Sequence, residues 1–530
     1  MKKIFFLSLV LVLFSQVSFA KDYLITDYGA VGDNVTLNTA SIQKAIDECS
    51  GNGGGRVVVP HGTFLSGTLF LRSYVDLYLE HNAVILANPN PNDFPNIYER
   101  NINKTGLIHA ENIEDASVTG FGTLNGNGSH PVFLTGGGQD PGRTYVIYLK
   151  NCKNIKVQDV YLRNPSFWTF RIYGCEDVFV RGIRIYSHAN FNNDGIDIDG
   201  RNITVSDCLI DSTDDGICLK SENPAAPCEN VTITNCVIAS NCNAIKFGTA
   251  SHSGFRNITI SNCVIKTPEE NDFFNYAGYT IPGVISKIAN NSGIALEMVD
   301  GGIFEKVSIT NITMDNVHTP VFIRLGNRRG KPQFMRDIII SNIIANSTSL
   351  MTSSITGIPG YLVENVKISN IIFNCPGGGL KEHVERTVPE SERAYPENRM
   401  FGANLPSYGF YVRHAKNISL ENVYFNVGYK DERPAVWFEN VHSACINQIE
   451  SNVHPLSQPF VWLRNVSDIT VSGFKSSYKI PLFLRLEGKN SSDVKLLFND
   501  FSNVSKIYEK DKDLKTNAVI ESYNLKSSKK

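Results

Sequence analysis

The segments NITVSDCLIDSTDDGICLKS (residues 202–221) and NVTITNCVIASNCNAIKFGT (residues 230–249) repeat one pattern. In each, an asparagine is followed by alternating apolar and polar residues, and a cysteine stands six positions after the asparagine. Such alternation, rich in β-branched residues, is typical of a strand that buries one face. The two segments therefore indicate a repeated unit made of short strands.

The opening motif of this unit, a polar residue followed by apolar, any and apolar residues, recurs along most of the chain. Its copies begin at residues 154, 177, 202, 230, 257, 306, 337, 365, 417, 468 and 493. Self-similarity with steps of this length is typical of solenoid proteins. Sustained helical periodicity is absent from the repeats, so helical and leucine-rich repeats fit poorly. We predict an all-β fold, a right-handed parallel β-helix solenoid in which successive turns stack.

The cysteines follow the repeat. The chain has eleven of them, so at least one must be free or paired between chains. Cys208, Cys236 and Cys263 occupy the same place in three units, where other units carry Ile312 and Ile371. A position that accepts Cys or Ile is typical of a core ladder, so we interpret these cysteines as reduced core thiols rather than disulfides.

The asparagines that open the motif also form Asn-Ile-Thr sequons, at Asn202, Asn257 and Asn311. Since the repeat itself explains their recurrence, we interpret them as turn residues rather than as glycan sites.

The two ends of the chain suggest further features. Residues 1–20, MKKIFFLSLVLVLFSQVSFA, have a basic start, an apolar run and small residues near Ala20. They predict a signal peptide cleaved after about Ala20, and hence a secreted or periplasmic protein, with an uncleaved anchor as the alternative. No later apolar stretch is long enough for a membrane span. Residues 38–65 begin with an amphipathic helix pattern, so we expect a short capping helix within an N-terminal cap of about residues 21–75.

Composition excludes other classes. The formal net charge is −2 and the basic residues are scattered, which argues against a nucleic-acid partner. Metal-ligand spacings of the CxxC or HExxH kind are absent, so we predict no metal site. Residues 376–410, rich in proline, glycine and charge, are expected to form a loop excursion between turns.

Acidic residues gather where two repeats begin a strand. Aligned by repeat, three strands carry apolar residues two apart: GIDIDG (195–200), GICLKS (216–221) and AIKFGT (244–249). The side chains between them should face outward in two columns, Asp197, Cys218 and Lys246 in the first and Asp199, Lys220 and Gly248 in the second. Asp194 precedes the first strand and Asp214–Asp215 the second. Because adjacent turns lie about 4.8 Å apart, these three carboxylates should crowd into one patch.

Crowded carboxylates suggest acid–base chemistry. Like charges at short range disfavour simultaneous ionisation, so at least one acid should keep its proton near neutral pH. A protonated acid beside ionised ones is what cleavage of a glycosidic bond requires. The alternative is an aspartate ladder that binds calcium or caps turns. The shared edge of the acids and the flanking lysines favour the catalytic interpretation.

The segments NNDGIDI and TDDGICL resemble the Asn-Thr-Asp and Asp-Asp segments of glycoside hydrolase family 28, the polygalacturonases and rhamnogalacturonan hydrolases, with one change at Asn193. DYGAVGDNVTLNTASIQKAID, GRVVVPHGTFLSGTLFLRS, VTGFGTLNGNG and NPSFWTFRIYGCEDV also look like the N-terminal half of that family. The resemblance implies that Asp214 is the general acid and that Asp194 and Asp215 activate the attacking water, with inversion and without metal or organic cofactor.

The resemblance fails in the next turns. Polygalacturonases carry Gly-His-Gly where this chain has CNA (242–244), and Arg-Ile-Lys where it has GIALEM with Ala295 and Glu297. We therefore predict that the substrate is bound by other residues: Asn193, Lys220, Asn243, Lys246 and Arg324. Of these, Lys246 and Arg324 would supply charge for an acidic sugar. The alternative is that they form ion pairs with Asp197 and Glu297.

Together these features predict that residues 21–530 form one catalytic β-helix domain, a monomeric glycosidase that acts on pectic polysaccharide or oligosaccharide of the galacturonan or rhamnogalacturonan type. Three alternatives stay open: a hydrolase for another acidic polysaccharide, a lyase, and a non-catalytic carbohydrate-binding β-helix. The loops at residues 268–292 and 376–410 are candidates for walls of the cleft.

Overall fold

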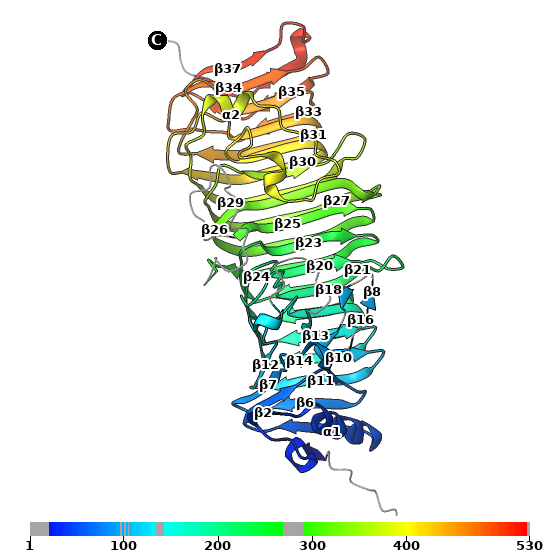
Figure 1. Cartoon of the computed structure of the whole chain (residues 1–530). Helices are drawn as coiled ribbons and strands as arrows, with labels where there is room; N and C mark the ends of the chain where they lie inside the picture. The colour runs from blue at the N-terminus through cyan, green and yellow to red at the C-terminus, as the bar shows by residue number, and fades with distance from the viewer. Residues whose placement is uncertain are drawn as a thin grey trace, which may run out of the picture.

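The computed structural model describes residues 21–95, 98–99, 102–103, 105–133, 143–268 and 290–526. The chain winds into an elongated coil, with its first turns at one end and its last turns at the other (Figure 1). Within these residues 35 strands join one sheet, and neighbouring turns pair in parallel. This confirms the prediction of an all-β parallel β-helix. The expected signal peptide and residues 269–289 of one expected cleft wall lie outside the described residues.

The strands are short in the first turns and become longer where consecutive faces merge. The first turns contain β1 (Asp22–Leu24), β2 (Asp33–Leu37), β3 (Gly55–Val59), β4 (Gly62–Ser66), β5 (Leu69–Phe70), β6 (Val75–Leu79), β7 (Ala83–Ala87), β8 (Tyr98–Glu99), β9 (Ile102–Asn103), β10 (Gly106–Glu111), β11 (Glu114–Gly120) and β12 (Thr123–Asn125). The middle turns contain β13 (Tyr145–Lys150), β14 (Lys153–Gln158), β15 (Tyr161–Arg163), β16 (Phe170–Arg181), β17 (Arg184–Ser187), β18 (Ile196–Ser206), β19 (Leu209–Ser212), β20 (Ile217–Ser221), β21 (Cys228–Thr234), β22 (Val237–Ser240), β23 (Asn243–Ser251), β24 (Gly254–Ile265), β25 (Asn290–Asp300) and β26 (Ile303–Gly330). The last turns contain β27 (Phe334–Ser347), β28 (Ser353–Thr356), β29 (Val363–Cys375), β30 (Phe410–Val427), β31 (Val436–Ser451), β32 (Val461–Arg464), β33 (Ser467–Ser472), β34 (Ile480–Glu487), β35 (Ser492–Leu497), β36 (Asp500–Phe501), β37 (Val504–Lys510), β38 (Val519–Ser522) and β39 (Leu525–Lys526). The described helices are α1 (Thr39–Gly51), α2 (Lys381–Glu385) and the 3-10 helices η1 (Ile25–Tyr28), η2 (Pro91–Asp93), η3 (Pro131–Phe133), η4 (Asn398–Phe401) and η5 (Thr516–Ala518).

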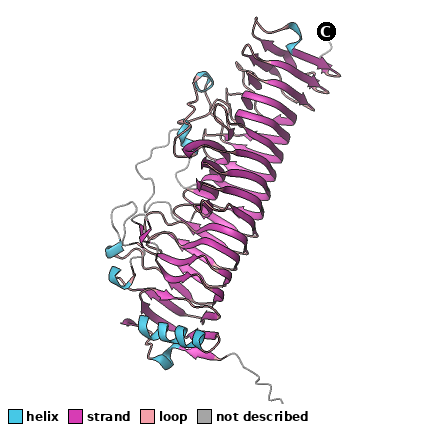
Figure 2. Ribbon diagram, turned by 90° about the vertical axis from the view of Figure 1, so that its right-hand side faces the viewer, coloured by secondary structure: helices cyan, strands magenta, loops and turns pink. Residues whose placement is uncertain are grey.

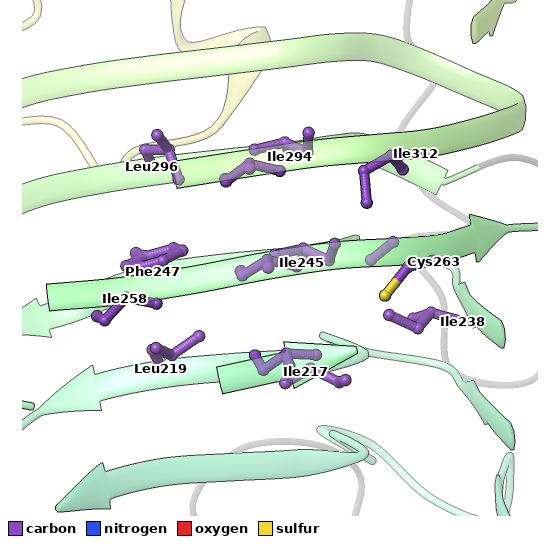
Figure 3. Close-up of a cluster of buried hydrophobic side chains, with 14 of the residues drawn as sticks. Ile217, Leu219, Ile238, Ile245, Phe247, Ile258, Cys263, Ile294, Leu296 and Ile312 are labelled. Atoms are coloured by element: carbon purple, nitrogen blue, oxygen red, sulfur yellow. The ribbon is translucent and has the colours of Figure 1, made fainter. Parts of the chain in front are cut away.

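Apolar side chains from successive turns stack inside the coil. Ile217 pairs with Ile245, and Ile245 pairs with Ile294, so each turn adds one isoleucine to the same ladder (Figure 3). A parallel ladder also joins Cys263 to Ile312. All of these side chains are buried, so each turn fills the core by covering its neighbours.

The structure confirms the interpretation of the cysteines and shows that the repeat asparagines adopt a conformation usual in turns. All eleven cysteines lie in the described residues as free thiols, ten of them buried and Cys445 exposed. Asn202, Asn230 and Asn257 adopt φ values of 57°, 56° and 58°, a left-handed conformation that asparagine tolerates better than most residues. Their side chains also form a ladder, because Asn230 Nδ2 donates to Asn202 Oδ1 over 3.0 Å and Asn257 Nδ2 donates to Asn230 Oδ1 over 2.7 Å.

Helix α1 lies at the N-terminal end of the coil (Figure 1). Its buried residues, Ile42, Ala45, Ile46 and Cys49, follow the spacing of one helical face and pack against the first strands. None of the described helices has the length and hydropathy that a membrane span requires.

A long segment between β29 and β30, residues 376–409, leaves the coil; we call it the excursion. It contains α2 and η4, and it lies with other loops along one side of the coil (Figure 2). Its Phe401 packs on Phe322 of β26, with 6.3 Å between ring centroids. The excursion predicted from composition is therefore present, and it is folded back onto an outward face of the coil.

Candidate active site

The stacking of turns brings the acidic residues together. Gly195 N donates to the Asp215 carbonyl over 2.8 Å, and Gly216 N donates to the Asn243 carbonyl over 2.8 Å. Asp194, Asp215 and Asn243 therefore hold equivalent places in three consecutive turns. Gly195 permits this close approach, since a Cβ there would lie 2.3 Å from the Gly216 carbonyl oxygen.

The strand register confirms the first of the two predicted outward columns, whereas the register shifts after Leu219 and does not pair Lys220 with Gly248. Asp197 pairs with Cys218, and Cys218 pairs with Lys246. These side chains point away from the hydrophobic core, yet all three are buried by neighbouring polar groups and loops. The acidic patch is thus the floor of a covered site rather than an open surface.

Two buried lysines neutralise part of the acidic cluster. Lys220 Nζ lies 3.1 Å from Asp197 Oδ1 and 3.8 Å from Asp194 Oδ2. Lys246 Nζ lies 3.0 Å from Asp215 Oδ2 and 3.8 Å from Glu297 Oε2. With Asp214 the site holds more carboxyl groups than lysines, so it favours keeping at least one proton.

Asp214 and Asp215 are adjacent in sequence, but their surroundings shift their pKa values in opposite directions. Burial, followed by repulsion from Asp215, raises the pKa of Asp214 to about 6. Burial also opposes ionisation of Asp215, but Lys246, Lys220 and the hydrogen bond from Asn243 hold the pKa of Asp215 below its ordinary value. Asp214 is half-buried whereas Asp215 is fully buried. The pair therefore offers a carboxyl group with a raised pKa at the more exposed position and a carboxylate with a lowered pKa at the buried one.

Asp194 completes the cluster. Burial raises the pKa of Asp194 well above its ordinary value, and the charges of Asp197 and Asp214 add to this rise. Its Oδ1 atom is buried without a hydrogen-bond partner among the described residues. A buried oxygen of this kind calls for a donor, and a bound water would supply one.

The two asparagines predicted to bind substrate, Asn193 and Asn243, instead form hydrogen bonds within the protein. Asn193 Oδ1 accepts from the main-chain N–H groups of Ala189 (2.9 Å) and Asn190 (2.6 Å). Its Nδ2 donates to the carbonyls of Pro165 (3.2 Å) and Phe167 (2.7 Å). This amide is saturated and holds the turn before β18, so the structure corrects the expectation that Asn193 binds substrate.

Asn243, which was predicted to bind substrate, forms a hydrogen bond with Asp215. Asn243 Nδ2 donates to Asp215 Oδ1 over 2.9 Å, and the Asn243 side chain is buried. It therefore orients the carboxylate and stabilises its ionised form.

The predicted cations divide into two groups. Lys220 and Lys246 lie inside the cluster, where the ion pairs above occupy them. Arg324 pairs in register with Glu297, one turn on, as expected. Its guanidinium is buried, however, and donates to the carbonyls of Gly357 (3.2 Å), Glu390 (2.7 Å) and Ser391 (3.1 Å). We correct its expected role, because these contacts assign Arg324 to holding the excursion rather than to binding an acidic sugar.

Two aromatic residues at the site were not predicted. Lys220 Nζ lies 4.5 Å from the ring centroid of Trp168, and Lys246 Nζ lies 3.5 Å from the hydroxyl of Tyr395. Trp168 could have been found by counting back one turn from Asp194, because Phe170 pairs with Ile196. Tyr395 belongs to the excursion, which has no repeat register.

One group of residues could in principle hold a metal ion. Ligand atoms of Asp214, Asp215 and Cys242 lie within 4.8 Å of one another among the described residues. The Lys246 ammonium, 3.0 Å from Asp215, already supplies a positive charge there and would repel a cation.

Comparison with known proteins finds relatives among the glycosidases. Residues 49–271 match the family described as glycosyl hydrolases family 28. A probable polygalacturonase from Vitis vinifera is 33% identical over 214 residues, which are 37% of this chain and 44% of that protein. An exo-poly-alpha-D-galacturonosidase from Dickeya chrysanthemi is 28% identical over 248 residues, 36% of this chain and 41% of that protein. The chain thus spans less than half the length of either relative.

A solved structure extends the likeness of the fold. An exopolygalacturonase from Thermotoga maritima superposes with a TM-score of 0.59 at 20% identity, over 76% of this chain and 91% of that chain. The similarity of fold therefore continues well beyond the matched family segment.

Proposed function

Because residues 49–271 of this chain belong to glycosyl hydrolases family 28, we propose that the chain is a glycosidase that cleaves pectic polysaccharide or oligosaccharide of the galacturonan or rhamnogalacturonan type. The relatives from Vitis vinifera and Dickeya chrysanthemi, named as acting on polygalacturonic substrates, support this substrate class. The observation that carries the proposal is the division of Asp214 and Asp215 into an acid and an anion within one covered cluster.

We propose a mechanism with inversion at the anomeric carbon, as the resemblance to family 28 implies. Asp214 is half-buried and keeps its proton up to a pH of about 6, so it protonates the leaving glycosidic oxygen. Asp215, held ionised by Lys246 and oriented by Asn243, accepts a proton from the attacking water. The unpartnered Oδ1 of Asp194 holds that water. In this scheme the chemistry needs no cofactor.

The buried lysines tune this site rather than grip the substrate. Lys220 and Lys246 are ion-paired to aspartates, so their first effect is on carboxyl pKa values. Tyr395 lies beside Lys246 and forms part of the wall that the excursion gives to the site. An acidic sugar that approached Asp214 would meet this wall on the side of the C-terminal turns.

We also propose the finer architecture and the location of the protein. The coil is right-handed, residues 21–530 form one catalytic domain, and α1 closes its first turn within a cap of about residues 21–75. The buried face of α1 against the first strands supports this role. Residues 1–20 act as a signal peptide, so the protein is secreted or periplasmic and acts as a monomer.

Product analysis on defined oligosaccharides tests the function. Purified protein should hydrolyse saturated oligogalacturonides or rhamnogalacturonan fragments, and early products followed by proton NMR should show the inverted anomer. Unsaturated products that absorb ultraviolet light, or loss of activity with a chelator, would instead indicate a lyase. Absence of turnover on a full panel of acidic polysaccharides would indicate a binding protein and would overturn the proposal.

A further inference from the structure

A concave site lies on the same face of the coil as the acidic cluster, nearer the C-terminal turns. Its volume is about 530 Å³, within the range of about 300–1,000 Å³ that is usual for ligand sites. The excursion forms one wall, from Val384 to Pro389, and the outward side chains of three consecutive turns, Tyr411, Trp437 and Trp462, form the floor. We call it the aromatic cavity.

The aromatic cavity is separate from the acidic cluster. The column of Lys246 continues through Ala295, Phe322 and Ser354 to Tyr411, so Tyr411 lies four turns beyond Lys246. At about 4.8 Å per turn, this is about 19 Å along the coil. The excursion covers the intervening turns, where Phe401 packs on Phe322. The two sites therefore lie at different turns, with part of the excursion packed between them.

Two buried donors of the aromatic cavity have no partner among the described residues. Trp437 is 3% exposed, and its Nε1 makes no hydrogen bond. The neighbouring Trp462 lies parallel to it, 4.5 Å away, and uses its own Nε1 to donate to Glu487 over 3.1 Å. The Nε atom of Arg413, also 3% exposed, is likewise unpartnered. Since buried donors are normally satisfied, they indicate an acceptor that enters the cavity.

The remaining polar groups of the cavity favour an uncharged occupant. Arg413 Nη1 donates to the Val388 carbonyl over 2.9 Å, and its Nη2 donates to the Pro389 carbonyl over 2.8 Å. Arg464 donates to Glu487 over 2.9 Å, and Arg386 donates to carbonyls within the excursion. Apart from Arg413 Nε, these guanidinium groups are therefore largely engaged within the protein.

A carboxylate that entered the cavity would also face an acid already present. Glu439 lines the cavity and accepts a hydrogen bond from the Tyr411 hydroxyl over 3.0 Å. A carboxylate ligand would meet this negative charge, which Arg464, 3.9 Å from Glu439 and also paired with Glu487, offsets only in part. Hydroxyl groups can both accept from the unpartnered donors and donate to Glu439.

We propose that the aromatic cavity binds a neutral pyranose unit of a polysaccharide. Such a ring presents apolar C–H surface to the indole and phenol edges, and hydroxyl groups to Trp437 Nε1 and Glu439. This site goes beyond the proposed activity and does not depend on it. A polysaccharide held there would stay close to the acidic cluster between cleavage events, which raises its effective concentration.

Titration calorimetry with the full chain tests the proposal, with β-1,4-linked galactotetraose and xylotetraose as neutral probes and trigalacturonate as the acidic probe. At least one neutral probe should bind. Trp437→Phe, which keeps a six-membered aromatic ring but removes the N–H group with the rest of the pyrrole ring, should weaken that binding by about fivefold or more, at least the value of one net hydrogen bond. Trp462→Ala, at a partly exposed position, should also weaken it. Far-ultraviolet circular dichroism and melting curves check that both variants fold.

The controls separate this site from the acidic cluster. Trp168→Phe alters the tryptophan beside Lys220 and should leave the affinity for the neutral probe unchanged. Asp214→Asn should abolish hydrolysis of pectic substrates and leave that affinity unchanged, so failure of either proposal can be told from failure of the other. Absence of binding by both neutral probes, or equal affinity in folded Trp437→Phe and Trp462→Ala, would overturn the inference. Trigalacturonate binding that these two variants weaken would also overturn it.

Discussion

The Lys246 ammonium lies 3.0 Å from the Asp215 carboxylate and separates the protonation of two adjacent aspartates. It helps to hold the pKa of Asp215 below the ordinary value, whereas burial and the Asp215 charge raise the pKa of Asp214 to about 6. Lys246 comes from the turn after the aspartates, so stacking of the β-helix supplies the charge that distinguishes them. Our account of the chemistry depends on this relationship.

Replacing Lys246 should move the pH profile of catalysis upward. In the wild type, activity should fall as the pH rises through about 6, because Asp214 then loses the proton that it must donate. Lys246 lowers the pKa of both aspartates, so Lys246→Met should shift both limbs of the kcat/KM profile to higher pH and reduce the maximum. Lys367→Met, on an exposed outward position of β29, is the control and should keep the wild-type profile. An unshifted alkaline limb in Lys246→Met would contradict the assignment.

Glu297 should make the folded state less stable in alkaline solution. Burial raises the pKa of Glu297 to about 8, so the folded protein binds a proton that the unfolded chain releases near its ordinary pKa. Stability is therefore lost as the pH rises from the unfolded value through about 8. At about pH 5, Glu297→Gln should have the melting temperature of the wild type. At about pH 9 its melting temperature should be higher, which corresponds to an unfolding free energy about 1–3 kcal/mol larger than that of the wild type. Equal melting temperatures at both pH values would show that Glu297 does not titrate in this way.

Substitution by alanine should lower the unfolding free energy strongly in a core ladder and weakly at an outward-facing position. Ile343 is fully buried in the ladder that contains Cys263 and Ile312, whereas the next residue, Ile344, is 49% exposed. Ile343→Ala should cost about 2–5 kcal/mol of unfolding free energy because it leaves a cavity. Ile344→Ala should cost no more than about 0.5 kcal/mol. Denaturant unfolding of the two variants checks this, and similar losses would contradict the assigned orientation of the strand.

The fold and the placement of the acids could be predicted from the sequence because both follow the repeat. One alignment places Ile217 on Ile245 and Asp197 beside Cys218, and the strand register agrees. The period fixes which side chains share a column, but it does not fix what each side chain contacts. Asn193 has the residue type expected for a substrate contact, yet its amide is saturated by main-chain groups.

The other contacts that the sequence did not predict involve the excursion. Tyr395 reaches Lys246 from 149 residues away in sequence, and Arg324 is covered by the carbonyls of Glu390 and Ser391. Segments outside the repeat have no register, so their contacts with the coil depend on packing that a period cannot specify. The contact of Tyr395 with Lys246, one of the two buried lysines, has the same origin.

Labelling with a thiol reagent should show which cysteines are buried in the core. Since all eleven cysteines are free thiols and Cys445 is the exposed one, a thiol reagent should label one site quickly in the native protein and eleven after denaturation. Reducing agent should leave the melting temperature unchanged. Fewer than eleven reactive thiols in denaturant without reductant would reveal a disulfide and contradict the ladder of free thiols.

The turnover of Asp214→Asn tests the central claim most directly. We predict a loss of about 10²–10⁴-fold in kcat on an oligogalacturonide or rhamnogalacturonan fragment, without the alkaline limb near the pKa of Asp214. Asp207→Asn neutralises an exposed turn aspartate of the adjacent strand and should keep wild-type turnover. A folded Asp214→Asn protein that turns over substrate within a few-fold of the wild type would contradict the account.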